Sequence, residues 1–160
     1  MQLRRAHEGE AEALCAIALE SKAFWSYSKA QLEAWRGELT VTQGSISTGL
    51  AWVADVDGRV AGFFVLAPSP RLWTLEHFWV LPDFMRRGVG RSLLSRAAEL
   101  AVRGGAEGIA IDADPNAAPF YRACGAMRTG SLAAPIDGQP QRVRPQMLLP
   151  VGPGDTRPPR

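Results

Sequence analysis

Apolar residues recur along this chain with two different periods, and each period predicts its own kind of element. Four stretches have the spacing that is typical of amphipathic helices: residues 9–24, 29–39, 91–103 and 116–124. In the third stretch, one helical face carries Leu93, Leu94, Ala97, Ala98 and Ala101. Each of these stretches is therefore predicted to be a helix, and Gly125 closes the last of them.

Other stretches are apolar throughout or at alternate positions, which favours strands. They are residues 2–6, the two halves of 50–68, 71–82, 107–113 and 145–149. Asp57-Gly58 lies in the middle of 50–68 and is a two-residue hairpin signal, so these two strands should pair antiparallel. Residues 40–49 are rich in Thr, Ser and Gly and are predicted to form a loop.

The length of 160 residues suits one domain with a substantial core. We assign residues 1–150 to that domain and expect residues 151–160, which are rich in proline and glycine, to be disordered. The net charge of +2 is small, and the arginines are scattered among acidic residues. Nucleic acid is therefore not an expected partner.

The apolar runs, the first residues and the cysteine spacing predict the cellular compartment and whether the chain binds a metal. No apolar run approaches the roughly 18 residues of a membrane span, and the first residues do not resemble a signal peptide. We therefore expect a cytoplasmic protein with no membrane partner. The two cysteines, Cys15 and Cys124, do not have metal-ligand spacing, so we predict neither a metal site nor a disulfide.

Two glycines, Gly88 and Gly90, stand where a loop becomes the helix of 91–103. The first turn of a helix presents unpaired N–H groups at the positive end of its dipole, and glycine lets an anion approach them. Arginines at 86, 87 and 91 would add positive charge. A Walker loop is excluded because no Gly-Lys pair exists, and Leu93 takes the last glycine position of the dinucleotide fingerprint. A different phosphate-binding loop is predicted.

The stretch "FWVLPDFMRRGVGRSLL" resembles the acetyl-CoA signature of the GNAT N-acetyltransferase superfamily, Q/R-x-x-G-x-G/A after a strand, with Met85 at the Q/R position. A second stretch, "DPNAAPFYRACGAM", resembles the family's N-x-x-A-x-x-x-Y-x-x-x-G-F motif. Tyr121 and Gly125 match it, whereas Asn116 lies five residues before the tyrosine instead of seven and Ala126 replaces the usual aromatic. The order of elements matches the family over roughly residues 1–150.

This resemblance implies an α/β fold of the α+β type, with a mixed, mostly antiparallel central sheet flanked by helices and splayed between the fourth and fifth strands. It implies acetyl-CoA as the co-substrate and no metal. By resemblance, the main chain of the splayed strand receives the thioester and pantetheine, and the glycine loop receives the pyrophosphate. The implied cofactor-binding residues are Phe78, Trp79, Val80, Arg86, Arg87, Gly88, Val89, Gly90, Arg91, Ser92, Asn116 and Tyr121.

Acetyl transfer to an amine needs a base for the amine and gains from an acid for the leaving thiolate. Glu76 lies in an otherwise apolar strand, where a carboxylate is costly unless it is paired, wet or useful, so it is a candidate base beside His77 or a water chain. The family resemblance implies Tyr121 as the acid. Asp112 and Asp114 are better explained as a strand end and a helix cap than as a carboxylate pair.

Two functions remain open at this point. The first is an N-acetyltransferase that acts on a primary amine of a small molecule or a peptide, with Trp25 and Tyr27 either walling the acceptor site or packing in the core. The second is a catalytically silent GNAT-like domain that binds acyl-CoA. Many relatives form dimers, so the resemblance allows a homodimer. The acceptor is not identified, because residues 24–49 and 131–143 are expected to form its variable loops.

Overall fold

Strands β2 (Ala51–Val56) and β3 (Arg59–Ala67) form the predicted antiparallel hairpin. Asp57 and Gly58 both adopt positive φ, 53° and 81°, which matches the right-handed twist of the flanking strands. The Asp55 carboxylate accepts a hydrogen bond from the Gly58 N–H at 2.9 Å and closes the turn. The local sequence signal therefore decides this connection.

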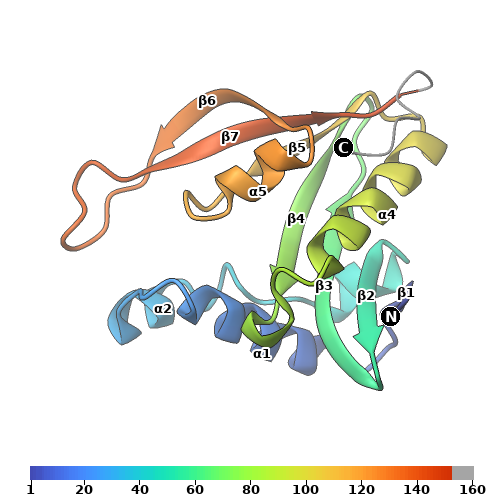
Figure 1. Cartoon of the computed structure of the whole chain (residues 1–160), viewed down its shortest axis with the longest axis horizontal. Helices are drawn as coiled ribbons and strands as arrows, with labels where there is room; N and C mark the ends of the chain where they lie inside the picture. Colours follow the sequence, from blue (N-terminus) through green and yellow to red (C-terminus); the bar gives the residue numbers. More distant parts are fainter. Residues whose placement is uncertain (153–160) are drawn as a thin grey trace. The chain divides into compact units, whose positions relative to one another are not determined.

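The computed structural model describes residues 1–152 of the chain (Figure 1). Two compact units form: Met1–Leu66 with Glu76–Arg96, and Ala67–Leu75 with the chain from Ala97 onward. The boundary between them passes through strand β4 (Leu72–Val80) and through helix α4 (Val89–Arg103). The predicted tail of residues 151–160 lies outside the described residues from 153 onward.

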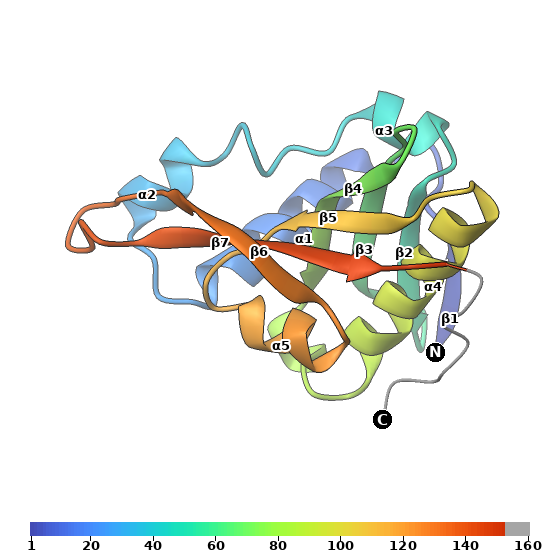
Figure 2. The same cartoon turned by 90° about the horizontal axis from the view of Figure 1, so that it is seen from above.

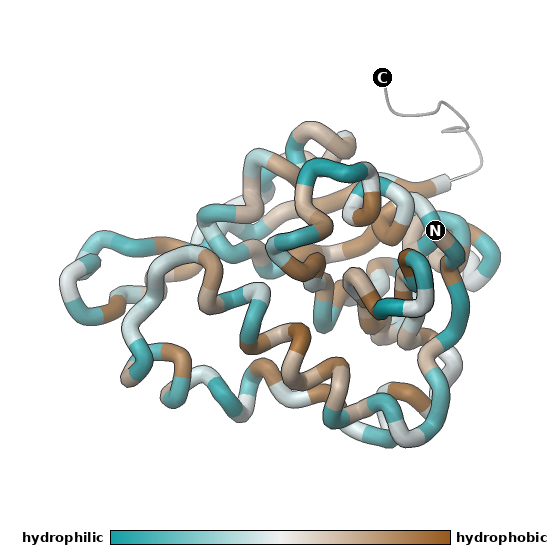
Figure 3. Tube along the Cα trace, turned by 60° about the horizontal axis from the view of Figure 1, so that its bottom comes forward, coloured by the Kyte–Doolittle hydropathy of each residue, from teal (hydrophilic) through white to brown (hydrophobic). Residues whose placement is uncertain are grey.

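The first unit contains β1 (Gln2–Arg5), which pairs antiparallel with β2. Its helices are α1 (Ala11–Ala23), α2 (Lys29–Ala34) and α3 (Gln43–Ser47), and it includes the first half of α4. Figure 3 colours the trace of the chain by hydropathy and shows hydrophobic and hydrophilic residues interspersed along its helical turns. Fully buried side chains from α1, the strands and α4 make its core: Leu14, Val53, Phe63, Phe64 and Leu93.

The second unit contains β5 (Gly108–Asp112), α5 (Ala118–Ala123), β6 (Met127–Ala133) and β7 (Val143–Pro150). Strand β5 pairs parallel with the start of β4 and antiparallel with β7, and β7 pairs antiparallel with β6. Figure 2 shows β6 and β7 as a long two-stranded ribbon. Val151, just after β7, is buried and donates its N–H to the Glu107 carbonyl.

Hydrogen-bonded neighbours follow the strand order β1-β2-β3-β4-β5-β7-β6. Only β4–β5 is parallel among the pairs described here, so the predicted mixed, mostly antiparallel α/β architecture is confirmed. The pairing of β4 with β5 covers Leu72–Thr74 and Gly108–Ala110, while β4 continues to Val80. That restricted pairing is what a sheet splayed after its fourth strand requires.

Three local predictions were wrong. The second helix ends at Ala34 rather than at residue 39, with turns following it. The predicted loop of 40–49 contains α3, which begins because the Thr42 hydroxyl accepts from the Ser45 N–H. Strand β6 was not predicted, because all its residues are exposed and its sequence lacks alternation. Its hydrogen bonds to β7 create it, so the expected acceptor loop of 131–143 begins inside a strand.

Candidate functional site

The predicted phosphate loop follows directly from β4. The Leu81 N–H donates to the Ala61 carbonyl at 2.8 Å, and Pro82 begins a single 3-10 turn (Pro82–Phe84) that buries Phe84. Arg86 and Gly88 then adopt left-handed conformations, with φ of 59° and 82°. The Gly88 carbonyl accepts the Ser92 N–H at 3.1 Å, so Gly88 stands directly before α4. The helix begins at Val89, so Gly90 lies in its first turn rather than before it.

Glycine is favoured at position 88 by the backbone conformation rather than by crowding from neighbouring atoms. A Cβ built there meets no protein atom within 4 Å, so packing against the protein does not require glycine. Positive φ is the constraint, because most L-residues pay a steric cost in this region. Asn and Asp tolerate it better than other side chains, which makes them useful probes of this position.

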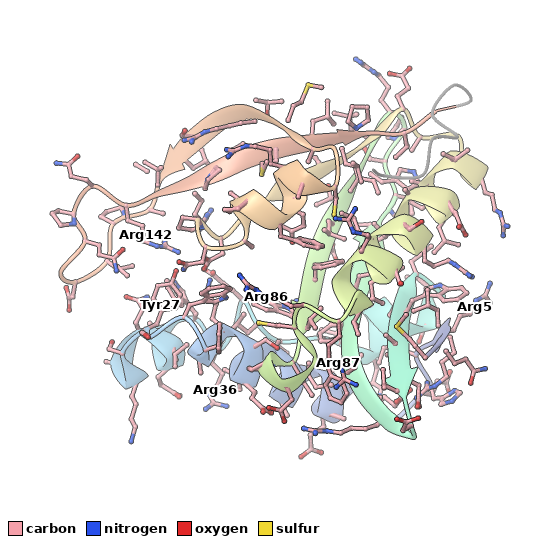
Figure 4. The ribbon with its side chains drawn as sticks, in the orientation of Figure 1. Arg5, Tyr27, Arg36, Arg86, Arg87 and Arg142 are labelled. Atoms are coloured by element: carbon pink, nitrogen blue, oxygen red, sulfur yellow. The ribbon has the colours of Figure 1, made fainter. Side chains whose placement is uncertain are left out.

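The start of α4 is electropositive. Helix geometry leaves the N–H groups of Val89, Gly90 and Arg91 without intrahelical acceptors, and the first turn holds no acidic residue. Arg86, Arg87 and Arg91 are exposed. Figure 4 shows the side chains of Arg86 and Arg87 leaving the loop in different directions. An anion such as a phosphate group suits this arrangement.

Arg87 has a second, structural contact. Its guanidinium lies 5.1 Å from the centre of the Phe84 ring, and the Arg59 guanidinium lies 5.2 Å from the same ring. Arg59 also pairs with Asp83 at 3.6 Å. These contacts border an open depression of about 160 Å³ that Met1, Val56, Phe84, Arg87 and Val89 line. Cation–π packing therefore orients Arg87 beside the loop.

Gly62 lies close to the β4 backbone, a contact that sequence reasoning missed. A Cβ at this β3 position would lie 2.5 Å from the Trp79 carbonyl oxygen and 3.1 Å from the Val80 Cα, so β3 presses on the β4 backbone where only glycine fits. Trp79 and Val80 are among the residues expected to receive the co-substrate's thioester arm. The available signal was a glycine inside an otherwise apolar strand, which indicates close backbone approach.

The alternation of side chains along β4 places Glu76 on the solvent-exposed face of the strand. Trp73 and Leu75 are buried, whereas Thr74 and Glu76 are exposed. Of the three alternatives left open for this carboxylate, paired, wet or useful, the exposed position agrees with a hydrated side chain.

His77 points to the other face and is held by hydrogen bonds. Its Nδ1 accepts from the Trp79 Nε1–H at 3.3 Å, its ring is bonded to the backbone of Thr40, and it lies near Phe63. Burial lowers the pKa of His77, against the smaller opposing effect of the Thr40 contact. The neutral ring is therefore a structural link between β4 and the segment before α3, which favours Glu76 over His77 as the base.

This linkage predicts an acid-sensitive contribution to stability. In the folded protein the pKa of His77 lies below its ordinary value of 6.5, so the unfolded chain binds a proton at this residue before the folded protein does. The free energy of unfolding is therefore unaffected by His77 above pH 6.5 and decreases as the pH falls below that value. Wild type should lose more unfolding free energy between pH 7.5 and 5 than His77→Gln does. Urea unfolding at both pH values measures this, and parallel losses in the two proteins would refute it.

Lys22 is buried among aromatic rings, a cluster that was not predicted. Its Nζ lies 4.5 Å from the Trp35 ring centre, 5.0 Å from that of Tyr27 and 5.9 Å from that of Trp79. Tyr27 and Trp35 meet edge to face at 4.7 Å. The side chain of Tyr27 is labelled in Figure 4. Tyr27 therefore packs into this cluster, while Trp25 pairs with the exposed Phe24 at the end of α1.

In the second unit, Tyr121 is buried on α5. Burial is the first cause that raises the pKa of its phenol, and electrostatic interactions with Asp114 and Cys124 add to it. The phenol therefore keeps its proton at neutral pH. Asn116 lies in the turn before α5, where its backbone N–H and its side-chain amide donate to the Asp114 Oδ1 at 2.8 and 2.9 Å.

The predicted site residues thus fall into two groups. Glu76, Phe78–Val80 and Arg86–Ser92 follow one another along one segment of the first unit, whereas Asn116 and Tyr121 belong to the second unit. Asp112 ends β5, and Asp114 caps the turn before α5 rather than the helix itself, because the N-cap residue is Ala117.

Residues 1–152 contain no cluster of His, Cys, Asp or Glu suited to a metal. None of the helices described there has the length and apolar content that crossing a bilayer requires.

Solved structures of several acetyltransferases resemble this chain. A GCN5-related N-acetyltransferase from Rhodopseudomonas palustris superimposes with a TM-score of 0.75 at 25% identity, over 94% of this chain and 95% of its own. The PaiA N-acetyltransferase of Thermoplasma acidophilum, solved with coenzyme A, gives 0.72 at 19% identity, over 93% and 98%. The ribosomal-protein-S18-alanine N-acetyltransferase of Escherichia coli gives 0.70 at 17%, over 98% of both chains.

No curated protein matches the sequence. The acetyltransferase (GNAT) family matches residues 13–126, a range that runs from α1 through the glycine loop to the end of the α5 motif. Both stretches that carried the sequence resemblance lie in or at the edge of that range, and the strand order and restricted β4–β5 pairing agree with it. The chain therefore belongs to the GNAT acetyltransferase family and is an acyltransferase.

Proposed function

We propose that this enzyme transfers the acetyl group of acetyl-CoA to a primary amine by direct attack. The observation that carries the proposal is the electropositive α4 start: a left-handed Gly88 cap, unpaired helix N–H groups and three exposed arginines directly after a β4 segment that extends past its partner. Coenzyme A is bound by the related PaiA protein from Thermoplasma acidophilum. Arg86–Ser92 hold the pyrophosphate, and the main chain of Phe78–Val80 holds the thioester arm.

The chemistry assigns each candidate a proton to move. The amine nitrogen forms a bond to the thioester carbonyl carbon, and the carbon–sulfur bond breaks as the sulfur leaves with the electron pair. Glu76 takes the proton that the amine loses, directly or through water, because its carboxylate is exposed on β4. A β4 main-chain N–H stabilises the oxygen's developing charge, and Tyr121 donates its phenolic proton to the sulfur.

The acceptor binds beside the aromatic residues that follow α1. Trp25 and Tyr27 wall this site, with Trp25 half-exposed and Tyr27 fixed by its contacts with Lys22 and Trp35. A panel of small amines and peptides with free amino groups, incubated with acetyl-CoA and followed by release of free thiol, tests the function. Thiol release that no amine accelerates would contradict acetyl transfer and would leave an acyl-CoA-binding module instead.

Glu76→Gln should lower turnover because it keeps the side chain's shape and removes its basicity. General base catalysis is commonly worth about 10² to 10⁴ in rate, and the loss should shrink as pH rises and the amine deprotonates by itself. The pH dependence of kcat measures this effect. Glu107→Gln, which removes another exposed carboxylate of an ion pair with Arg71, is the matched control and should leave kcat unchanged. A Glu76→Gln pH profile that coincides with wild type would assign the base to a water chain.

A further inference from the structure

A buried ion pair lies at the turn that leads into α5. The Asp114 Oδ2 is 3.6 Å from the Arg142 Nη2, and the two side chains are only 10% and 4% exposed. Burying two charges is costly unless further hydrogen bonds support them. Here the Asp114 Oδ1 accepts two bonds from Asn116, and the Arg142 Nη1 donates to the Ala134 carbonyl at 3.1 Å.

The Asp114 turn is connected to Tyr121 by an unbroken series of hydrogen bonds. The Asp114 carbonyl accepts the N–H groups of Ala117 and Ala118, and the Ala117 carbonyl accepts the N–H of Tyr121. The Asp114 carboxylate is also near enough to the phenol to act on its charge, and it is the larger of the two charge effects that raise the pKa of Tyr121. The ion pair therefore lies at the turn from which α5 begins, and its carboxylate adds, after burial, to the electrostatic environment of the phenol.

Other charged groups near α5 are engaged elsewhere. Strands β6 and β7 pack against α5, and each carries an arginine. On β6, Arg128 donates to the Gly130 carbonyl and to the Ser131 hydroxyl. On β7, Arg144 pairs with Asp112 at 3.0 Å. Cys124, at the end of α5, is the remaining titratable group that acts on the phenol. Arg142 lies within ion-pair distance of Asp114.

We propose that Arg142 is a positioning residue for the acid Tyr121. Through its ion pair with Asp114 it holds the turn that starts α5 and offsets the carboxylate's negative charge, which keeps the phenol a usable proton donor. The inference rests on the acid role of Tyr121 in the proposed function. When the phenol gives its proton to the leaving sulfur it becomes a phenolate, and an unbalanced Asp114 charge beside it would oppose that step.

Turnover of four variants tests the inference. Arg142→Gln leaves the Asp114 charge unbalanced, so kcat should fall roughly tenfold. This is less than the whole rate acceleration of about 10² to 10⁴ that general acid catalysis supplies. Asp114→Asn combined with Arg142→Gln removes both charges and should restore most of kcat. Arg142→Lys keeps the charge and should lose less than Arg142→Gln. Arg144→Gln removes the neighbouring arginine of the Asp112 pair and should change nothing.

A spectroscopic measurement separates charge from mere structure. The chain has two tyrosines, Tyr27 and Tyr121, so Tyr27→Phe leaves one phenol. With fluorotyrosine incorporated in that background, the fluorine NMR signal reports the ionisation of position 121 in each folded variant. The titration should move to higher pH in Arg142→Gln and return in the double variant. An unchanged titration in Arg142→Gln would overturn the inference, as would a double variant that is no more active than Arg142→Gln.

The failure of this inference differs from a failure of the acid role itself. Suppose that Tyr121→Phe lowers kcat, and that Arg142→Gln lowers kcat by the same factor in the Tyr121→Phe background as in wild type. The arginine then acts independently of the phenol, and the inference fails while the acid role stands. If Tyr121→Phe leaves kcat unchanged, the acid role fails and the inference fails with it. Little further loss from Arg142→Gln in the Tyr121→Phe background is the expected result.

Discussion

Tyr121→Phe should lower kcat about 10²-fold and leave the affinity for acetyl-CoA nearly unchanged. The substitution removes only a hydroxyl, so α5 keeps its packing. We place the loss at the lower end of the about 10² to 10⁴ typical of general acid catalysis. The reason is that burial raises the pKa of the phenol above its ordinary value of 10, whereas a thiol has a pKa near 8.5. Proton transfer to the sulfur is therefore uphill, and the acid accelerates the reaction less than a better-matched one would.

Steady-state kinetics and calorimetry together measure this result. A fall in affinity alone would make Tyr121 a contact of the co-substrate, and no change in either quantity would return it to a core aromatic. An acetyl thioester with a more acidic thiol needs less help from an acid, so it should rescue Tyr121→Phe more than it accelerates wild type. Equal acceleration of both proteins would contradict the acid role even if kcat had fallen.

Gly88→Asp should weaken acetyl-CoA binding far more than Gly88→Asn. Both side chains tolerate positive φ, and no atom lies within 4 Å of the added Cβ, so the two variants carry the same backbone strain and differ by one charge. A carboxylate about 7 Å from a phosphate charge costs roughly 2 kcal/mol at an effective dielectric constant near 20, or about 30-fold in Kd.

Calorimetric titration with acetyl-CoA at two ionic strengths measures that difference. Salt should weaken binding to wild type moderately and narrow the gap between the two variants, because both effects are charge on charge. Thermal unfolding of the variants verifies that the loop still folds. Equal affinities for Gly88→Asp and Gly88→Asn in folded protein would show that no phosphate lies at the start of α4.

Features encoded by neighbouring residues could be predicted from the sequence. Asp57-Gly58 supplies a hairpin turn through its own φ preferences, and the helical spacing of Leu93, Leu94, Ala97 and Ala101 predicts the buried face of α4. The glycine loop and the Tyr-x-x-x-Gly stretch were sufficient to identify the family. Each of these signals depends on a few consecutive residues, whose steric and hydrogen-bonding preferences do not need the rest of the chain.

Features that depend on distant residues were decided by the tertiary structure. Strand β6 has no pattern of its own and exists because β7 pairs with it. Nothing near Arg142 in the sequence indicates Asp114 as its partner, and nothing near Gly62 indicates that Trp79 presses against it. The partner of a buried charge is the residue that the tertiary structure places beside it, so such contacts depend on the whole chain. The exposed position of Glu76 followed from the same cause, because burial is a property of packed elements rather than of a strand alone.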